Sequence, residues 1–206
     1  MNLLFVCACG YLIGSIPSGF LLTKLTKGID LRNFGSSSTG ATNVLRTGDK
    51  KLAIMTLFFD VLKGFAFSSG VLIFFDELTL YISSFFCLIG HAYPIWLKFK
   101  GGKGVATVAG IFLSISPVIT LISALIWGIV AKFGKISSIA SLSFCFTFSL
   151  IAAIKSLNDH SFVRLTLFSI SVFVFLLYTH HSNIKRLFSH EENNFYNKLK
   201  NNKEKL

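Results

Sequence analysis

Three short polar stretches interrupt an otherwise apolar chain, and their residue types suit phosphate chemistry. The first runs from Gly35 to Arg46 and is rich in Gly, Ser and Thr. Small hydroxylated residues and accessible backbone N–H groups can wrap a phosphate, and an arginine adds a matching charge. The same composition is typical of an ordinary flexible loop. This stretch alone therefore leaves both interpretations open.

The second stretch runs from Gly90 to Thr107 and carries Gly101, Gly102 and Gly104 around Lys103. These glycines let backbone amides approach an anion, and the lysine adds a point charge where the next helix is expected to begin. The GxxxxGK[ST] spacing of nucleotide-binding loops is absent. The alternative is an anchor of Lys, Trp and Tyr at a membrane surface.

The third stretch contains His180 and Asn183, which are three residues apart and share one face of a helix. An imidazole with an unperturbed pKa of about 6.5 suits a general base. A substrate phosphate can accept the proton equally well, and histidines at a helix end are often interface residues. No serine has an obvious paired base, so a covalent acyl-enzyme is not expected.

The composition shows what must position these residues. Of 206 residues, 52% are hydrophobic and 14% are charged, against about 25% charged in soluble domains. Long unbroken apolar runs predict an all-α polytopic membrane helix bundle and disfavour a membrane β-barrel, and the apolar content excludes disorder. The apolar runs lie at residues 3–23, 52–75, 79–97, 104–131, 136–154 and about 161–179.

The run 104–131 decides the topology, because Ser114 to Pro117 can be a kink or a turn between two helices. If this run crosses twice, nearly all loop Lys and Arg lie on one side, with Lys155 and Arg164 on the other. The positive-inside rule favours this arrangement. We therefore predict seven transmembrane helices, the N-terminus outside, and the C-terminus and all three polar stretches in the cytoplasm.

The charged and sulfur-containing residues support the same class of protein. The net charge of +11 then lies at the cytoplasmic face, where it suits anionic headgroups or an anionic substrate and makes nucleic acid an unexpected partner. Asp60 and Lys63 lie within one apolar run at i, i+3 spacing, which favours a structural ion pair. The cysteines form no metal-ligand pattern, so no metal site is expected.

The motifs together identify a family. They read GSxxxGATNxxR, GHxYPIWLKFKGGKGVAT and HxxNIxR in chain order, after an opening segment GSIPS at 14–18. This series resembles the bacterial PlsY family of acyl-phosphate:glycerol-3-phosphate acyltransferases over residues 10 to about 192. The resemblance implies a multi-pass inner-membrane enzyme with one domain at 1–192, a basic polar tail at 193–206, and an active site at the cytoplasmic face.

The implied reaction moves a fatty acyl group from acyl phosphate to the sn-1 hydroxyl of glycerol 3-phosphate. Lysophosphatidic acid and phosphate are the products, as in the first acylation of bacterial phospholipid synthesis. Both substrates and membrane lipid are the expected partners, and a monomer without cofactor is expected. The implied catalytic residues are Ser36, Arg46, Lys103, His180 and Asn183, the substrate-binding residues are Thr42, Asn43, Gly101, Gly102 and Gly104, and structural support comes from Glu192, Asp60 and Lys63.

The sequence departs from the family pattern at four positions. Ser37 and Ser38 replace a Gly and an Asn, His181 replaces an Arg, and His190 replaces a Gly. Activity with altered affinity is expected, because the principal polar residues are retained.

A small transporter or channel for an anion or a phosphorylated solute is the alternative function. Intramembrane Asp60 and Lys63 and the Gly-rich short helices fit that alternative. A transporter gathers its polar residues near the middle of the membrane, whereas the polar stretches here are expected at one interface. This placement favours the enzyme.

Overall fold

The computed structural model describes residues 2–189, and those residues form helices and connecting turns without strands. The all-α prediction is confirmed for this part of the chain. Packing divides the chain into two compact units, Met1–Ile115 and Ser116–Leu206, which are described separately below.

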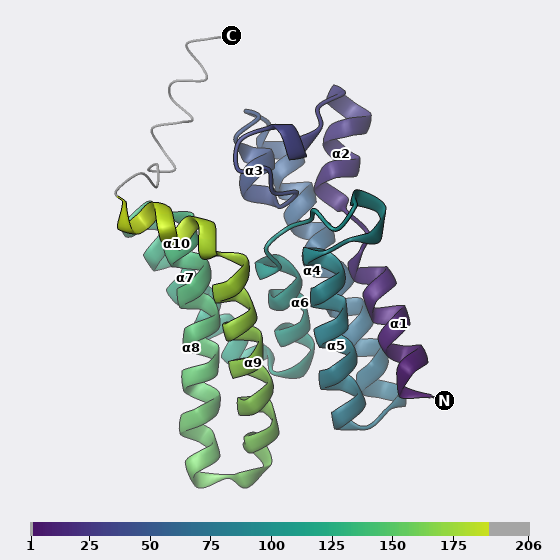
Figure 1. Ribbon diagram of the computed structural model, residues 1–206. Coiled ribbons are helices and arrows are strands. Elements are labelled where there is room, and N and C mark those ends of the chain that lie inside the picture. The colour runs from purple at the N-terminus through teal and green to yellow at the C-terminus, as the bar shows by residue number, and fades with distance from the viewer. Residues whose placement is uncertain (1, 190–206) are drawn as a thin grey trace. The chain divides into compact units, whose positions relative to one another are not determined.

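In the first unit, long helices pack in pairs, and the short helices α2 and α3 flank a connecting loop (Figure 1). The helix α4 packs against α6 and α2, and α1 packs against α5. The helices are α1 (Leu3–Gly14), α2 (Ser18–Lys27), α3 (Ala41–Leu45), α4 (Lys50–Phe74), α5 (Glu77–Ala92) and α6 (Val105–Ile115), with short 3₁₀ turns at Leu31–Asn33 and Ile95–Leu97.

Glycines allow the helices of the first unit to approach backbone to backbone. A Cβ atom on Gly14 of α1 would lie 1.9 Å from the carbonyl oxygen of Cys87 on α5. A Cβ atom on Gly64 of α4 would lie 2.3 Å from the carbonyl oxygen of Thr107 on α6. Small residues at helix contacts are a common way of packing membrane helices. The position of α6 against α4 matters for function because α6 begins just after Lys103.

The first apolar run, at 3–23, lies in one candidate membrane span, Leu3–Lys27, that is built from two helices. The helix α1 ends at Gly14, and α2 begins at Ser18. Pro17 explains the break, because proline lacks an N–H group and disfavours helical backbone in the residue before it. The break leaves the Ile16 carbonyl group and the Ser18 hydroxyl group to be satisfied by other parts of the unit.

In the second unit, α8 packs against both α7 and α9. Its elements are α7 (Pro117–Gly134), α8 (Ser137–Asn158), a 3₁₀ turn (His160–Phe162), α9 (Val163–Thr179) and α10 (His181–Phe188). The run 104–131 is interrupted at Ser116, whose ψ of 83° is not helical, and Pro117 begins α7. Proline is favoured at the first position of a helix. Of the two alternatives for this run, two separate helices are therefore confirmed.

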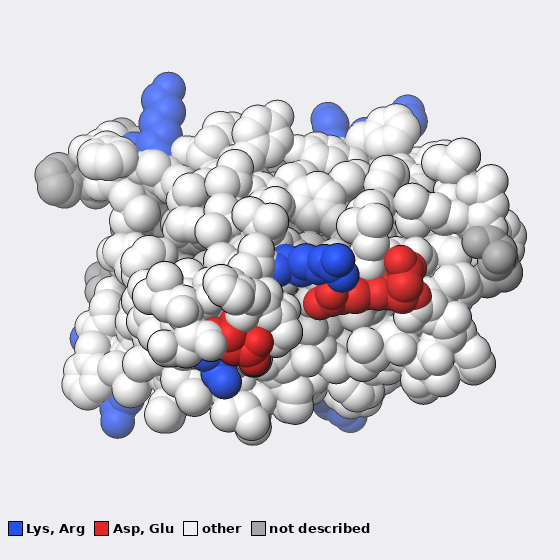
Figure 2. All heavy atoms as spheres, turned by 90° about the horizontal axis from the view of Figure 1, so that it is seen from below, with Lys and Arg blue, Asp and Glu red and all other residues white. Residues whose placement is uncertain are grey.

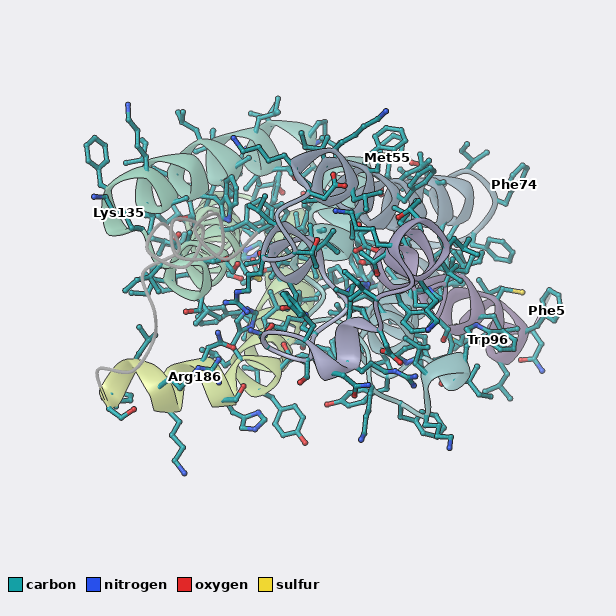
Figure 3. All side chains as sticks on the ribbon, turned by 90° about the horizontal axis from the view of Figure 1, so that it is seen from above. Phe5, Met55, Phe74, Trp96, Lys135 and Arg186 are labelled. Atoms are coloured by element: carbon teal, nitrogen blue, oxygen red, sulfur yellow. The ribbon has the colours of Figure 1, made fainter. Side chains whose placement is uncertain are left out.

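Six helices or helix pairs in the described residues are long and apolar enough to cross a membrane. The six do not include α6, whose 11 residues extend only about 16 Å of the roughly 30 Å hydrocarbon core. Apolar side chains such as Phe5 and Phe74 project outward (Figure 3), and charged side chains are sparse on the face in Figure 2. Seven crossings and the predicted orientation stay predictions.

Candidate functional site

The first polar stretch folds around the side chain of Asn43, which is 1% exposed. Its Oδ1 atom accepts a hydrogen bond from the Ser36 amide at 3.0 Å. Its Nδ2 atom donates to the carbonyl oxygens of Phe34 at 2.9 Å and Ser38 at 2.8 Å, and to that of Leu31 at 3.2 Å. Because its amide is occupied by backbone groups, Asn43 shapes the loop that presents Ser36.

Glycine at position 35 brings Ser36 close to Arg46. The φ of Gly35 is 58°, and a Cβ atom there would lie 2.3 Å from Asn43 Oδ1 and 3.3 Å from Arg46 Cδ. The side chain of Arg46, at the C-terminal end of α3, therefore runs past the turn that holds Ser36. Thr42 lies in the first turn of the same short helix.

Two departures from the family pattern lie in this loop, and one of them adopts a backbone conformation that favours glycine. Ser37 has a φ of 57°, the left-handed region in which glycine is favoured. A glycine is therefore the natural residue here, and Ser37 occupies its conformation at some cost in free energy. Ser38 accepts a long hydrogen bond of 3.4 Å from the Gly40 amide through its hydroxyl oxygen.

The loop is also held by an ion pair at its start. Asp30 and Arg32 are joined by two hydrogen bonds, of 3.0 Å from Arg32 Nε and 2.6 Å from Arg32 Nη2. The hydrogen bonds and charge of Arg32 lower the pKa of Asp30 to about 2. The carboxylate also caps the 3₁₀ turn Leu31–Asn33 by accepting from the Arg32 amide.

The second polar stretch doubles back on the end of α5. The Gly101 amide donates to the Ala92 carbonyl at 3.1 Å, and the Gly102 amide donates to the His91 carbonyl at 3.0 Å. A Cβ atom on Gly101 would lie 2.3 Å from the His91 carbonyl oxygen, and one on Gly102 would lie 2.1 Å from His91 Nε2. These two glycines are therefore required for packing against α5.

This pairing corrects one expectation about the glycines. We predicted that their backbone amides approach an anion, but the amides of Gly101 and Gly102 are already donated to carbonyl oxygens within the protein. Lys103 follows them half-buried, and Gly104, with a φ of 96°, leads into α6. The geometry fits a rigid support that presents Lys103 and the first turn of α6.

The two stretches are joined to each other. The Thr39 amide of the first donates to the Gly101 carbonyl of the second at 3.3 Å. The Thr39 carbonyl oxygen in turn packs on α2, where a Cβ atom on Gly19 would lie 2.1 Å from it. The stretch of Ser36 and Arg46 is therefore joined by a backbone hydrogen bond to the stretch of Lys103 within the first unit.

Asp60 and Lys63 form the ion pair that their spacing predicts. Lys63 Nζ lies 3.0 Å from Asp60 Oδ1, and both side chains are buried. The pair also stabilises the break before α2, because Asp60 Oδ1 accepts from the Ser18 hydroxyl at 2.5 Å and Lys63 donates to the Ile16 carbonyl at 2.8 Å. The ion pair expected from the i, i+3 spacing is therefore observed.

His91 is a residue that sequence reasoning did not include in the site. Its Nδ1 atom lies 3.6 Å from Asp60 Oδ1, within ion-pair reach, and the other edge of the ring contacts Gly102. His91 is 6% exposed. Its place in the second motif, ten residues before a glycine pair, was the available signal.

The third polar stretch lies in the second unit, at the junction of α9 and α10. His180 is 2% exposed and Asn183 is 3% exposed, and the Asn183 amide donates to the His180 carbonyl at 2.9 Å. His180 Nδ1 lies 2.8 Å from the Leu176 carbonyl oxygen, which can only accept, so Nδ1 carries a proton. In the neutral ring, Nε2 is then the atom that can accept a proton.

The remaining predicted positions fall into two groups. His181 is exposed, and its ring lies 6.0 Å from that of Tyr178, so this departure lies at the surface. Glu192, His190 and the tail 193–206 lie outside the described residues.

Trp96 is 63% exposed and points outward (Figure 3), as expected for an interfacial anchor. Among residues 2–189, no three His, Cys, Asp or Glu side chains gather at metal-binding distance.

Comparisons with known proteins place this arrangement in a family. The family model described as glycerol-3-phosphate acyltransferase matches residues 4–190. A glycerol-3-phosphate acyltransferase of Pelagibacter ubique is 40% identical over 93% of this chain and 97% of its own length. One from Wolbachia pipientis wMel is 43% identical, again over 93% of this chain and 97% of the relative.

Solved structures agree with the sequence relatives. The crystal structure of PlsY, an integral membrane glycerol 3-phosphate acyltransferase, in its glycerol 3-phosphate form has a TM-score of 0.86 and 35% identity. It is matched over 93% of this chain and 94% of its own. The lysophosphatidic acid form has a TM-score of 0.84 and 34% identity over the same shares. The chain therefore belongs to the PlsY family of integral membrane glycerol-3-phosphate acyltransferases.

Proposed function

We propose that this protein transfers a fatty acyl group from acyl phosphate to the sn-1 hydroxyl of glycerol 3-phosphate. Lysophosphatidic acid and inorganic phosphate are the products. The observation that carries the proposal is the hydrogen bond from Thr39 to Gly101, because it joins the loop of Ser36 and Arg46 to the loop of Lys103. Family membership supplies the substrate class, since the related PlsY was solved with glycerol 3-phosphate and with lysophosphatidic acid.

The residue types suit this chemistry. Acyl phosphate is a mixed anhydride with a good leaving group, so catalysis requires orientation of the glycerol hydroxyl and stabilisation of anionic oxygens. Arg46 and Lys103, one cation from each of the joined stretches, supply that stabilisation. Ser36 donates a hydrogen bond to a substrate oxygen. Thr42 adds a second hydroxyl beside Arg46 in α3.

The glycines and Asn43 have a different role in this proposal. Gly101, Gly102 and Gly104 give the second loop its shape, and Asn43 gives the first loop its shape, so that both substrates meet a fixed set of donors. Preorganised donors are effective because they do not reorient during the reaction. The binding role predicted for these residues is thus an indirect one.

His180 and Asn183 serve the same reaction from the second unit. With Nδ1 donating to the Leu176 carbonyl oxygen, Nε2 is the ring atom of neutral His180 that can take the proton of the glycerol hydroxyl. A phosphate oxygen of the substrate is the alternative acceptor, in which case His180 and Asn183 orient the substrates. Both units then work as one acyltransferase domain, with Glu192 as structural support.

We infer a setting in the bacterial cytoplasmic membrane, with the N-terminus outside and the three motifs at the cytoplasmic face of seven crossings. A site at this interface serves a soluble dianion and an acyl chain that stays in hydrocarbon. Membrane lipid is then a natural partner, and a monomer without cofactor suffices. The anion transporter is less favoured, because Asp60 and Lys63 neutralise each other within the helix packing.

The test is phosphate release by the purified protein supplied with acyl phosphate and glycerol 3-phosphate in a lipidic phase. Wild-type protein should release phosphate only when both substrates are present and should form lysophosphatidic acid. Arg46→Ala and Lys103→Ala should lose turnover, whereas Lys132→Ala, at the exposed end of α7, should retain it. Solute uptake into proteoliposomes without any acyl transfer would establish the transporter instead.

A further inference from the structure

We propose that Asp60 and His91 are positioning residues that hold the glycine loop 101–104, and with it Lys103, in the geometry that binds glycerol 3-phosphate. The inference rests on the proposed function and deepens it. It assigns a role in substrate binding to a buried cluster that joins Asp60 and Lys63 of α4 to His91 of the second motif.

The cluster connects the inside of the helix packing with the loop. Asp60 on α4 is 2% exposed and receives the Ser18 hydroxyl at 2.5 Å and Lys63 at 3.0 Å. The same carboxylate oxygen lies 3.6 Å from Nδ1 of His91 on α5. Three helices therefore meet at one carboxylate, and removing such a group leaves its buried partners unpaired.

The imidazole ring of His91 contacts the glycine loop at Gly102. Beyond Nδ1, the opposite ring edge lies against Gly102, where a Cβ atom would be 2.1 Å from Nε2, 2.8 Å from Cε1 and 3.0 Å from Cδ2. The His91 carbonyl also accepts the Gly102 amide at 3.0 Å. The ring and the backbone of one residue therefore fix the residue that immediately precedes Lys103.

The same cluster reaches the first loop through α2. Ser18, which bonds to Asp60, precedes Gly19, whose Cα atom packs against the Thr39 carbonyl. The Thr39 amide bonds to Gly101. Asp60 is thus linked to the glycine loop by two routes, one through His91 and one through α2 and Thr39. A displacement of about 1 Å at a binding group can reduce catalysis about 100-fold. Loss of either route should therefore weaken substrate binding by displacing Lys103.

Two variants of His91 separate its contacts. The amide of asparagine occupies the place of Nδ1 and keeps a polar group toward Asp60 but removes the ring edge at Gly102. The amide of glutamine reaches the place of Nε2 and keeps a group at Gly102. His91→Asn should raise the KM for glycerol 3-phosphate about 10-fold or more, with a smaller rise for His91→Gln. Asp60→Asn should act in the same direction, and none should change the KM for acyl phosphate more than about twofold.

A matched control exists on the same two helices. Ser68 on α4 and Ser84 on α5 share a buried hydrogen bond of 2.8 Å that does not involve the loop. Ser68→Ala removes a polar contact between α4 and α5 and should leave both KM values within about twofold of wild type. Thermal unfolding of each variant checks whether a His91 variant has lost folded protein and not only binding affinity.

Pairing with Gly102→Ala gives a sharper readout. The new methyl group collides with His91 in the wild-type background, so Gly102→Ala should raise the KM for glycerol 3-phosphate. In a His91→Asn background the ring edge is absent, and the added methyl group should then raise the KM by a much smaller factor. A simple loss of folded protein lowers the apparent kcat and leaves the KM unchanged, so interdependence in the KM reports on binding geometry.

Kinetics and calorimetric titration of glycerol 3-phosphate decide the matter together. Weaker binding and a raised KM in His91→Asn, with interdependence at Gly102, support the proposal. An active wild type with unchanged KM and affinity in His91→Asn and Asp60→Asn overturns it, as does a fall in kcat alone or independent effects at positions 91 and 102. A wild type that binds glycerol 3-phosphate without acyl transfer contradicts the proposed function. The role of Asp60 and His91 is then decided by whether their variants bind glycerol 3-phosphate more weakly in the titration.

Discussion

Replacement of Asn43 tests whether the first loop depends on this single side chain. Asn43→Ala removes the acceptor for the Ser36 amide and the donor for three carbonyl oxygens, those of Leu31, Phe34 and Ser38. A buried hydrogen bond contributes about 1 kcal/mol net, and shared geometry reduces the sum, so the expected loss is about 2–4 kcal/mol. For a chain of this size the unfolding midpoint should fall by about 5–15 °C.

The isosteric variant Asn43→Asp makes the test more specific. It keeps the shape but turns the donor into an acceptor that faces those carbonyl oxygens in a site that is 1% exposed. It should be at least as damaging as Asn43→Ala, because one oxygen of the buried carboxylate would keep the Ser36 amide as its donor and the other would face carbonyl oxygens. Asn33→Asp, the same change at an exposed position of the same loop, should be nearly neutral.

The assays are thermal unfolding in detergent and acyl transfer from acyl phosphate. Both Asn43 variants should lose most of the turnover at temperatures where they remain folded, because Ser36 is no longer held in place. If Asn43→Asp unfolds within about 1 °C of wild type and turns over normally, the side chain does not organise the loop and this reasoning is wrong.

Three further outcomes are expected. Gly14→Ala should destabilise the protein by about 1–3 kcal/mol, because its Cβ atom would lie 1.9 Å from a backbone oxygen of α5, whereas Gly70→Ala, with no atom within 4 Å, should be neutral or stabilising in thermal unfolding. Ser37→Gly should stabilise by about 0.5–1 kcal/mol by relieving a left-handed φ, and an unchanged midpoint would contradict the strain. Asp30 has a pKa lowered by Arg32, so its stabilising contribution is complete above pH 3.8 and is lost as the pH falls through about 2. Asp30→Asn should therefore flatten the acid limb of the stability profile, and an identical acid limb would exclude that contribution.

The sequence by itself determined the class of protein and its motif residues. Unbroken apolar runs require a helix to satisfy the backbone in lipid, so an all-α membrane protein followed from composition. The family also followed from the sequence, because its motifs are contiguous stretches such as the one from Gly90 to Thr107. The ion pair of Asp60 and Lys63 was predictable since i, i+3 neighbours on a helix meet regardless of the rest of the fold.

Only the tertiary structure decided how the backbone groups of the motifs are used. The glycines at 101 and 102 suggested that their amides bind an anion. The chain instead folds back on α5, and these amides donate to carbonyl oxygens about ten residues earlier in the sequence. The motif suggested that Asn43 binds substrate, whereas its side-chain amide bonds backbone groups of the first loop. His91 is part of the second motif, but the motif does not reveal its role, because that role depends on two partners, one on α4 and one in the glycine loop. Local patterns encode local contacts, whereas the assignment of donors to acceptors depends on which distant segments the packing brings together.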